Sequence, residues 1–339
     1  MSKIIVNYTL YLGTMANKVA LGKARQDNNK TFERLGFPVE DLVCKNYKLP
    51  LLPNLQGLWL HVKMLVRRGG HNEFYYQYPT SARNGFPIVA RLLHVFHNRI
   101  VLIIHDVQSL RYHRDPSQDI GIFNSADLII AHTEPMRQWL IDHGVKTPIV
   151  LLHIFDYYSE DDFLPVDDIV ARHNEVVFAG NLRKSEFLPA LCRHPFSGLT
   201  FNLYGLKGDI DFSSYPHIKY CGVFQGDHTG TIHGGWGLVW DGDSITTCDG
   251  VLGDYLRYNL PHKLSLYIAA GLPVIVWSQS AVADWVKENH LGLVVDSLEE
   301  LPERIAAVSE AEHRDYIAHC REMGNRLRNG EMLKARLND

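Results

Sequence analysis

A histidine and a lysine stand at the start of an apolar segment in the second half of the chain. The stretch "YNLPHKLSLYIAAGLPVIV" (258–276) reads as a short helix that begins at Pro261, a break at Gly271 and a buried strand. The free amides at a helix start carry partial positive charge, and Lys263 adds a full charge there, with His262 beside it. Such a helix start suits a phosphate group. A solvated lysine and a capping histidine explain the same residues, so both interpretations stay open.

Two aspartates precede this helix and directly follow a predicted strand. They are Asp241 and Asp243 in "WDGDSITTCDGVLGDYLRY" (240–258). Paired carboxylates can hold Mg²⁺ or Mn²⁺ against a diphosphate, accept hydrogen bonds from sugar hydroxyls, or form an Asp–Gly turn. The residue types leave these three alternatives open. Because Lys263 and the helix amides can neutralise a diphosphate alone, we predict no metal and no other cofactor.

The composition excludes several classes of protein. The chain has 339 residues, of which 46% are hydrophobic, so it can form about two domains with their own cores. A net charge of −4 argues against a general nucleic-acid binder. The five cysteines form no CxxC or CxxH pair, which predicts neither a zinc site nor a disulfide framework. Without a signal peptide or a run of about 18 apolar residues, we expect a cytoplasmic protein that is soluble or peripheral on the inner face of the cell membrane.

Short apolar, β-branched runs alternate with amphipathic segments along the first half of the chain. Continuous apolar runs separated by helical stretches are typical of strands that are buried on both faces of a parallel sheet. The strands predicted for this half are residues 3–8, 73–78, 99–106, 126–131 and 148–155. We therefore predict a first α/β domain.

An acidic, aromatic stretch at 156–168 interrupts this pattern and is interpreted as a linker. A second set of apolar runs follows and predicts a second α/β domain, before one charged helical stretch at about 310–337 ends the chain. The strands predicted for this half are residues 175–181, 199–205, 217–222, 236–241, 272–277 and 291–296. Two doubly wound domains place a cleft between them, and ligands of such sheets lie beyond the carboxyl ends of the strands.

The segment that contains both aspartates and the lysine resembles a known enzyme family. It reads "GLVWDGDSITTCDGVLGDYLRYNLPHKLSLYIAAGLPVIVW" and ends at residue 277. Together with "FAGNLRKSEFL" (178–188) and "IHDVQSLR" (104–111), it resembles the bacterial β-galactofuranosyltransferases of O-antigen assembly. It is similar, less closely, to the glucosyltransferases that extend GlcNAc on serine-rich adhesins. The resemblance covers nearly the whole chain, including "GKARQD" (22–27).

This resemblance implies a GT-B fold, in which two Rossmann-like domains face each other across a cleft. Residues 1–160 would form the N-terminal acceptor domain, and residues 170–315 the C-terminal domain that binds the nucleotide-sugar donor. A C-terminal helix within residues 316–339 would pack back on the N-terminal domain. The anion at the helix start would then be the diphosphate of a UDP-sugar, which is a substrate and not a cofactor.

The resemblance also implies a set of donor-binding residues. Lys263 matches the basic residue that binds the diphosphate in that family. Lys184 lies where the relatives carry an arginine, and the neighbouring Arg183 can supply a bidentate fork instead, so the assignment between these two stays open. Tyr204 lies where an aromatic ring can stack on uracil. The full predicted donor set is Asn181, Arg183, Lys184, Tyr204, Asp241, Asp243, Asp254, His262 and Lys263.

One departure from the wider GT-B group favours inversion at the anomeric carbon. Retaining GT-B enzymes usually carry two glutamates eight positions apart across the donor helix, where this chain has Lys263 and Gly271. An inverting transfer needs a base that takes the proton of the acceptor hydroxyl. The strand "RIVLIIHD" ends in His105 and Asp106, and we predict Asp106 as the base, with His105 second. The alternative is that Asp106 caps a turn and His105 packs beneath it.

Three other stretches carry residues of interest. Lys23 and Arg25 follow the first predicted strand, beyond Gly13. They could contact acceptor or donor phosphates, or they could belong to a solvated helix face, and the sequence favours neither alternative. "LPNLQGLWLHVKMLVRR" (52–68) mixes apolar and basic residues, as in a helix on an anionic membrane surface, and also as in a helix that packs on its own sheet. Thr133 is predicted as a structural N-cap.

These observations predict an inverting GT-B glycosyltransferase that transfers a hexose from UDP to a lipid-linked or oligosaccharide acceptor in the synthesis of cell-surface polysaccharide. Galactofuranose is the first candidate for the hexose, and glucose is the second. A catalytically silent protein that binds a nucleotide sugar and stabilises a partner enzyme is the alternative of another class, and the retained basic residues argue against it. The relatives that assemble suggest a homo-oligomer, and no nucleic-acid partner is expected.

Overall fold

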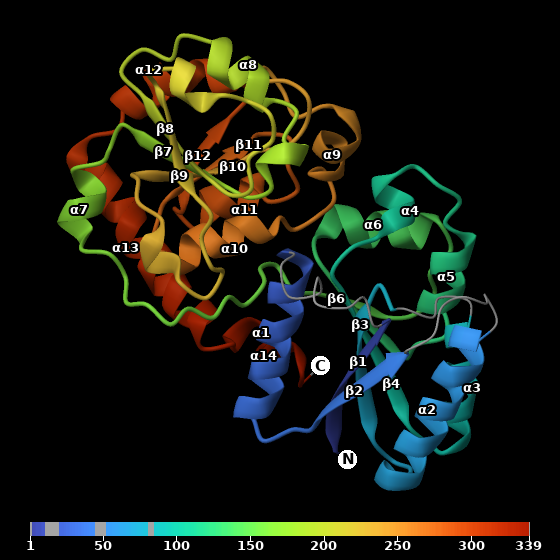
Figure 1. Cartoon of the computed structure of the whole chain (residues 1–339). Coiled ribbons are helices and arrows are strands. Elements are labelled where there is room, and N and C mark those ends of the chain that lie inside the picture. The colour runs from blue at the N-terminus through green and yellow to red at the C-terminus, as the bar shows by residue number, and fades with distance from the viewer. Residues whose placement is uncertain (1, 11–19, 45–51, 81–84, 339) are drawn as a thin grey trace. The chain divides into compact units, whose positions relative to one another are not determined.

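The computed structural model shows two compact units, each built around one six-stranded sheet (Figure 1). Unit 1 comprises residues 1–153 and 333–339, and unit 2 comprises residues 154–332. The strands pair in parallel in both sheets, which confirms the predicted α/β class with two doubly wound sheets. The structure describes residues 2–10, 20–44, 52–80 and 85–338.

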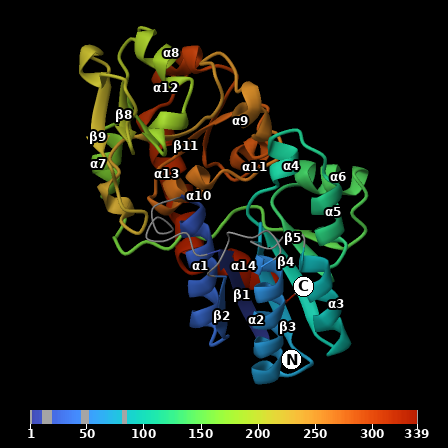
Figure 2. The same ribbon diagram turned by 45° about the vertical axis from the view of Figure 1, so that its right-hand side comes forward.

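Unit 1 has the strand order β2-β1-β3-β4-β5-β6, with helices on both faces of the sheet (Figures 1 and 2). Its strands are β1 (Lys3–Leu10), β2 (Val39–Cys44), β3 (Glu73–Tyr78), β4 (Arg99–Ile104), β5 (Leu128–Ala131) and β6 (Ile149–Leu151). Its helices before the boundary are α1 (Ala20–Arg34), α2 (Leu52–Arg68), α3 (Phe86–Val95), α4 (Gln108–Arg111), α5 (Ser117–Phe123) and α6 (Glu134–Asp142). The five strands predicted for this half are confirmed.

The helix α6 begins as its sequence predicts. The hydroxyl of Thr133 accepts a hydrogen bond from the amide of Met136 at 3.3 Å, with Glu134 and Pro135 in the first turn. The structural role predicted for Thr133 is therefore confirmed.

The edge strand β2 was not predicted from the sequence. Its sequence, VEDLVC, contains two consecutive acidic residues, Glu40 and Asp41, where the other strands have continuous apolar runs. Glu40 is nevertheless buried, because Arg67 and Arg68 of α2 each donate a hydrogen bond of 2.7 Å to its carboxylate. A strand whose charge is neutralised by a helix distant in sequence lacks the apolar pattern that identifies buried strands.

Unit 2 has the strand order β12-β11-β10-β7-β8-β9. Its strands are β7 (Glu175–Ala179), β8 (Thr200–Tyr204), β9 (Ile218–Gly222), β10 (Trp236–Val239), β11 (Val274–Trp277) and β12 (Gly292–Val295), so all six predicted positions are confirmed. Its helices are α7 (Val166–Val170), α8 (Leu188–Arg193), α9 (Gly250–Tyr255), α10 (His262–Ala269), α11 (Ala283–Glu288), α12 (Leu301–Ala306) and α13 (Glu310–Arg328).

The charged C-terminal stretch forms two helices where the sequence predicts one. α13 is followed by α14 (Glu331–Arg336), and the break lies at Gly330, which has a φ of 72°. This left-handed conformation ends a helix and favours glycine. Residues 333–339 group with unit 1.

The acidic stretch at 156–168 packs against other parts of unit 2. Tyr157 and Tyr158 are buried, and the carboxylate of Asp161 accepts hydrogen bonds from the Gly230 amide at 2.8 Å and from His228 Nδ1 at 3.0 Å. The stretch therefore makes specific contacts within unit 2 and is more than a solvated connection.

Candidate active site

Lys263 lies at the carboxyl edge of the sheet of unit 2. Its Nζ is 3.0 Å from Oδ2 of Asp241 and 3.3 Å from the carbonyl oxygen of Trp240, both of which directly follow β10. A Cβ added to Gly180, just after β7, would lie 3.0 Å from Cε of Lys263, so the lysine packs over a residue without a side chain. The structure thus brings together Lys263, Asp241 and the turn at Gly180, as expected for a site at the ends of parallel strands.

Tyr267 anchors the helix that carries this lysine. Its hydroxyl accepts a hydrogen bond of 2.8 Å from the amide of Ala179, and a Cβ added to Gly237 would lie only 2.2 Å from its ring. Lys263 precedes Tyr267 by one helical turn, so both side chains lie on the same face of α10. The prediction for Pro261 needs a correction, because it is the N-cap with a ψ of 127° and not a residue of the first turn.

The turn after β7 presents two cations. The side chain of Asn181 accepts a hydrogen bond of 3.2 Å from the amide of Arg183 and so caps the short 3₁₀ helix Leu182–Lys184. Arg183 and Lys184 are both exposed, and Nε of Arg183 donates to the carbonyl oxygen of Lys207 at 3.0 Å. Both cations stay candidates for the second contact to a diphosphate.

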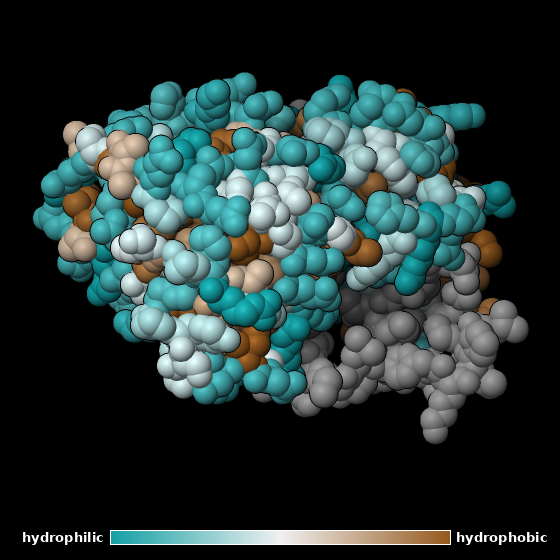
Figure 3. Space-filling view, turned by 90° about the horizontal axis from the view of Figure 1, so that it is seen from above, coloured by the Kyte–Doolittle hydropathy of each residue, from teal (hydrophilic) through white to brown (hydrophobic). Residues whose placement is uncertain are grey.

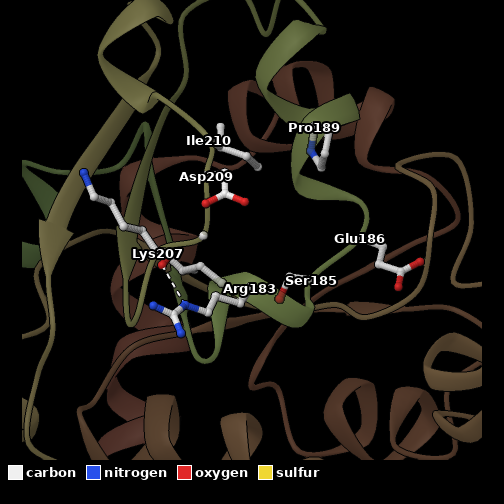
Figure 4. Close-up of a pocket in the computed structure, with 9 residues that line it drawn as sticks. Arg183, Ser185, Glu186, Pro189, Lys207, Asp209 and Ile210 are labelled. Carbon is white, nitrogen blue, oxygen red and sulfur yellow. Dashed lines mark hydrogen bonds between the residues drawn. The ribbon is translucent and has the colours of Figure 1, made fainter.

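A pocket of about 710 Å³ lies beside this turn (Figure 4). Its lining comes from the segments that follow β7 and β8, and Figure 4 shows Arg183 bonded to the Lys207 backbone at one side of it. The lining residues are Leu182, Arg183, Ser185, Glu186, Pro189, Lys207, Gly208, Asp209 and Ile210. Its place at the strand ends and the charged residues in its mixed lining suit a polar ligand.

Gly205, just after β8, lies against the turn at Gly180 after β7. Its replacement should disrupt both turns. It has a φ of 141°, and a Cβ there would lie 1.7 Å from the carbonyl oxygen of Gly180. We expect Gly205→Ala to lower the free energy of unfolding by about 2 kcal/mol or more, because the strained backbone and the clash add. Gly208→Ala is a matched control, since its nearest neighbouring atom would be at 3.6 Å. Equal urea midpoints for the two variants would contradict this account of the turns.

The other predicted donor residues lie in different surroundings. The ring of His262 packs between aromatic rings, with centroid distances of 5.0 Å to Tyr157 and 5.8 Å to Phe155. The carboxylate of Asp243 lies near Gly250, where an added Cβ would be 2.4 Å from Oδ2. Asp254 Oδ1 is 3.9 Å from Nε of Arg257.

Tyr204 is packed more deeply than a base-stacking residue needs. Its side chain is 6% exposed, its ring meets Phe224 edge-on, and its hydroxyl accepts a hydrogen bond from the amide of His233 at 3.1 Å. Burial raises the pKa of Tyr204 to about 12. Stacking on uracil stays a prediction, and this burial disfavours it.

The carboxyl end of β4 in unit 1 carries the two predicted bases. Asp106 is buried, and its Oδ2 lies 3.1 Å from Nη1 of Arg111, which forms an ion pair with it. His105 is partly exposed, and its Nε2 lies 2.8 Å from Oε1 of Gln77 in the neighbouring strand β3. Asp106 therefore carries a counter-ion, whereas His105 belongs to a network of neutral amides.

Gln77 determines which nitrogen of His105 carries the proton. Nε2 of Gln77 donates to Oδ1 of Asn7 at 2.8 Å and to Oδ1 of Asn29 at 3.1 Å, which fixes the orientation of the amide. Its Oε1 accepts from Asn28 at 3.0 Å and can only accept from His105, so Nε2 of His105 is the donor. In the neutral imidazole, Nδ1 then has the lone pair. Gln77 was not predicted from the sequence, where it could have been noticed only as a polar residue within the strand EFYYQY.

A second histidine at a strand end is structural. His132 follows β5, is fully buried, and its Nε2 donates to the carbonyl oxygen of Ile104 at 2.9 Å. Burial lowers the pKa of His132 to about 4, so the ring is neutral at pH 7 and serves as a hydrogen-bond donor.

Lys23 and Arg25 are held within unit 1. Nζ of Lys23 is 2.7 Å from Oδ2 of Asp27, and the guanidinium of Arg25 donates to the carbonyl oxygens of Gln77 at 3.0 Å and Pro79 at 2.7 Å. Burial lowers the pKa of Arg25 to about 10. The alternative of a solvated helix face is therefore wrong for both residues, and contact with substrate phosphates stays a prediction. Gly13 lies outside the described residues.

Within residues 2–10, 20–44, 52–80 and 85–338, no three histidine, cysteine or acidic side chains form a set of metal ligands. Asp241, one of the predicted alternatives for a ligand, is bonded to Lys263. In this position Asp241 could accept a hydrogen bond from a sugar hydroxyl as readily as it could bind a metal ion.

Both halves of the chain match models of one protein family. Residues 4–154 match the N-terminal domain of glucosyltransferase 3-like proteins, and residues 176–339 match the C-terminal domain. The chain is 30% identical over 260 residues to beta-1,6-galactofuranosyltransferase WbbI of Escherichia coli K12. The aligned residues cover 74% of this chain and 75% of the relative. It is also 26% identical over 351 residues to Glucosyltransferase 3 of Streptococcus gordonii. That alignment covers 98% of this chain and 97% of the relative.

Two solved structures share the fold over the whole chain. Sucrose-phosphate synthase from Thermosynechococcus elongatus superimposes with a TM-score of 0.68 at 14% identity, covering 100% of this chain and 98% of that one. Anabaena Alr3699/HepE, solved in complex with UDP, superimposes with a TM-score of 0.62 at 14% identity, covering 100% of both chains. These structures confirm the predicted GT-B fold, and the relatives above confirm the predicted resemblance to galactofuranosyl- and glucosyltransferases. The chain belongs to the glucosyltransferase 3-like family of glycosyltransferases.

Proposed function

We propose that this glycosyltransferase transfers a hexose from a UDP-sugar to a hydroxyl of a glycan acceptor, with inversion at the anomeric carbon. The observation that carries the proposal is the meeting of Lys263 and the start of α10 with the turn at Gly180. Galactofuranose is the first candidate for the hexose, supported by the name of the relative from Escherichia coli. The UDP in the HepE structure supports a nucleotide diphosphate as the carrier.

Unit 2 is proposed to bind the donor and to stabilise the leaving group. The diphosphate gains negative charge as the bond to the anomeric carbon breaks, and fixed cations beside it lower the barrier. Lys263 would exchange its contact with Asp241 for a phosphate oxygen, with Arg183 or Lys184 as a second cation. Asp241 would then be available to accept a hydrogen bond from a sugar hydroxyl.

Unit 1 is proposed to supply the base. The acceptor oxygen attacks the anomeric carbon, the bond from that carbon to the phosphate oxygen breaks, and UDP leaves. The proton of the acceptor hydroxyl passes to a base at the carboxyl end of β4, where His105 is the first candidate because its ring is partly exposed. The ion pair between Asp106 and Arg111 makes Asp106 the second candidate and so reverses the order expected from the sequence.

A panel of donors tests this assignment. Thermal shifts and turnover should be measured with UDP-galactofuranose, UDP-glucose and UDP, with acceptors that end in GlcNAc or glucose. A donor held by the folded protein raises the melting temperature. We expect UDP-galactofuranose to bind and to be consumed. Consumption of UDP-glucose alone would favour the glucosyltransferase, and binding without turnover of either donor would favour a silent partner protein.

Metal removal provides a separate prediction. Because Lys263 and the amides of α10 can balance the charge of the diphosphate, we expect activity to persist in EDTA. Turnover with and without EDTA, followed by addition of Mn²⁺, measures this. A complete loss that Mn²⁺ restores would make Asp241 and Asp243 metal ligands.

The acceptor is proposed to be lipid-linked or a free oligosaccharide of a cell-surface polysaccharide. A lipid-linked acceptor would place the enzyme at the inner face of the cell membrane. Among the described residues, no helix has the length and apolar character needed to span a bilayer. Assembly into a homo-oligomer stays a prediction.

A further inference from the structure

The outer side of α2 carries a continuous row of apolar side chains. The helix packs on the sheet of unit 1 through His61, Met64 and Leu65, which are buried. The opposite side exposes Leu55 by 63%, Trp59 by 54%, Val62 by 42% and Val66 by 83%. These four positions recur at intervals of four and three residues, so they form one stripe along the helix.

The neighbouring helix α3 extends this apolar area. It packs on the sheet through Phe86, Val89 and Leu93, and it exposes Ile88 by 57% and Val95 by 72%. α2 and α3 contact each other and lie on the same face of the sheet (Figures 1 and 2). We call the exposed residues Leu55, Trp59, Val62, Val66, Ile88 and Val95 the α2–α3 face.

This concentration differs from the rest of the described surface. Six of the thirteen large apolar side chains that are exposed among the described residues belong to this face. On the face of the molecule seen in Figure 3, hydrophobic residues lie in small, separate areas among hydrophilic ones. A grouped apolar area on a soluble fold marks a surface that another molecule covers.

The charges around the α2–α3 face identify that molecule. Neither the sequence of α2 nor that of α3 contains an acidic residue, although the whole chain has a net charge of −4. Lys63 and Arg91 are exposed, and Nζ of Lys63 lies 3.5 Å from the centre of the Trp59 ring. A second copy of this face would meet the first with like charges, and the core of a protein interface is depleted of charge. An anionic lipid surface provides both the apolar depth and the opposite charge.

We propose that the α2–α3 face binds the surface of an anionic phospholipid bilayer. Trp59 and the valines would enter the boundary between headgroups and acyl chains, while Lys63 and Arg91 would remain at the level of the headgroup phosphates. This binding does not depend on which sugar is transferred. It would hold unit 1 at the surface where a lipid-linked acceptor is presented, and so it deepens the proposed function.

Sedimentation with vesicles tests the proposal on the full chain. We expect the protein to pellet with vesicles of phosphatidylglycerol and phosphatidylcholine at low salt, to be released by high salt, and to stay in solution with phosphatidylcholine alone. Val62→Glu/Val66→Glu should lower the partition coefficient at least about tenfold. Lys63→Glu/Arg91→Glu should lower it by about fivefold or more for each cation removed. These side chains are exposed, so the variants should keep the wild-type unfolding midpoint and UDP thermal shift.

Ile141→Glu on α6 is the matched control, because Ile141 is an apolar residue of unit 1 with a similar exposure of 48%. This variant should pellet like the wild type. The proposal would be overturned if the wild type failed to pellet with anionic vesicles at low salt, or if the control lost as much binding as the α2–α3 variants. A wild-type oligomer that Val66→Glu converts to a monomer, without vesicle binding, would instead make this face a contact between subunits. If the protein bound vesicles but UDP did not raise its melting temperature, the result would contradict the proposed donor site and leave the membrane proposal standing.

Discussion

Replacing Lys263 by alanine should weaken UDP binding about 10- to 150-fold. A hydrogen bond to a charged partner contributes about 1.5–3 kcal/mol, and the side chain of Lys263 is partly buried at the strand ends. Lys263→Arg keeps the charge but not the geometry and should fall between the wild type and the alanine variant. Titration calorimetry with UDP measures these affinities directly.

Two further variants make this result specific. Lys287→Ala removes an exposed lysine of α11 in the same unit and should leave the affinity unchanged. Asp241→Asn removes the carboxylate that competes with phosphate for Lys263, so UDP affinity should stay the same or rise. If Asp241 were a metal ligand, the same change would weaken binding in the presence of Mn²⁺. An unchanged affinity in Lys263→Ala would mean that the diphosphate binds elsewhere.

Replacing His105 by glutamine should lower kcat about 10²- to 10⁴-fold while leaving UDP affinity unchanged. The glutamine keeps a hydrogen-bonding side chain toward Gln77 but has no basic nitrogen for the acceptor proton. Asp106→Asn should lower kcat much less, because its main effect is to weaken the contact with Arg111. A larger loss in Asp106→Asn than in His105→Gln would restore Asp106 as the base.

The positioning role of Gln77 can be separated from a purely structural one by the pH profile. Gln77→Glu places a carboxylate on Nε2–H of His105, and the side chains of Asn7 and Asn29 can rotate to donate to it. The nearby negative charge stabilises the imidazolium and should raise the pKa of His105. Because the base acts in its neutral form, the acid limb of kcat should move to higher pH by about one unit or more. A variant that loses stability without moving this limb would show that Gln77 only supports the fold.

Much of the fold could be predicted from the sequence because parallel strands buried on both faces leave continuous apolar runs. Eleven of the twelve strands lie at the positions predicted from such runs. β2 does not, because the charge of Glu40 is balanced by Arg67 and Arg68, and that pairing exists only in three dimensions. The break at Gly330 was also missed, since the charged sequence on both sides of it is helical.

The donor site was predictable in part. Lys263 and Asp241 are 22 residues apart, and strand order brings them together, because α10 follows β10 and returns across the sheet. The depth of Tyr204 and the contacts of Arg25 could not be inferred, because both depend on neighbours from distant segments. The tautomer of His105 depends on the orientation of one amide, which residue types do not specify.

A crystal structure of the protein with UDP tests the central claim most directly. The account predicts electron density for the diphosphate within hydrogen-bonding distance of Nζ of Lys263, beside the first amides of α10 and the turn at Gly180. Density for the diphosphate away from this turn, with Lys263 still bonded to Asp241, would contradict it.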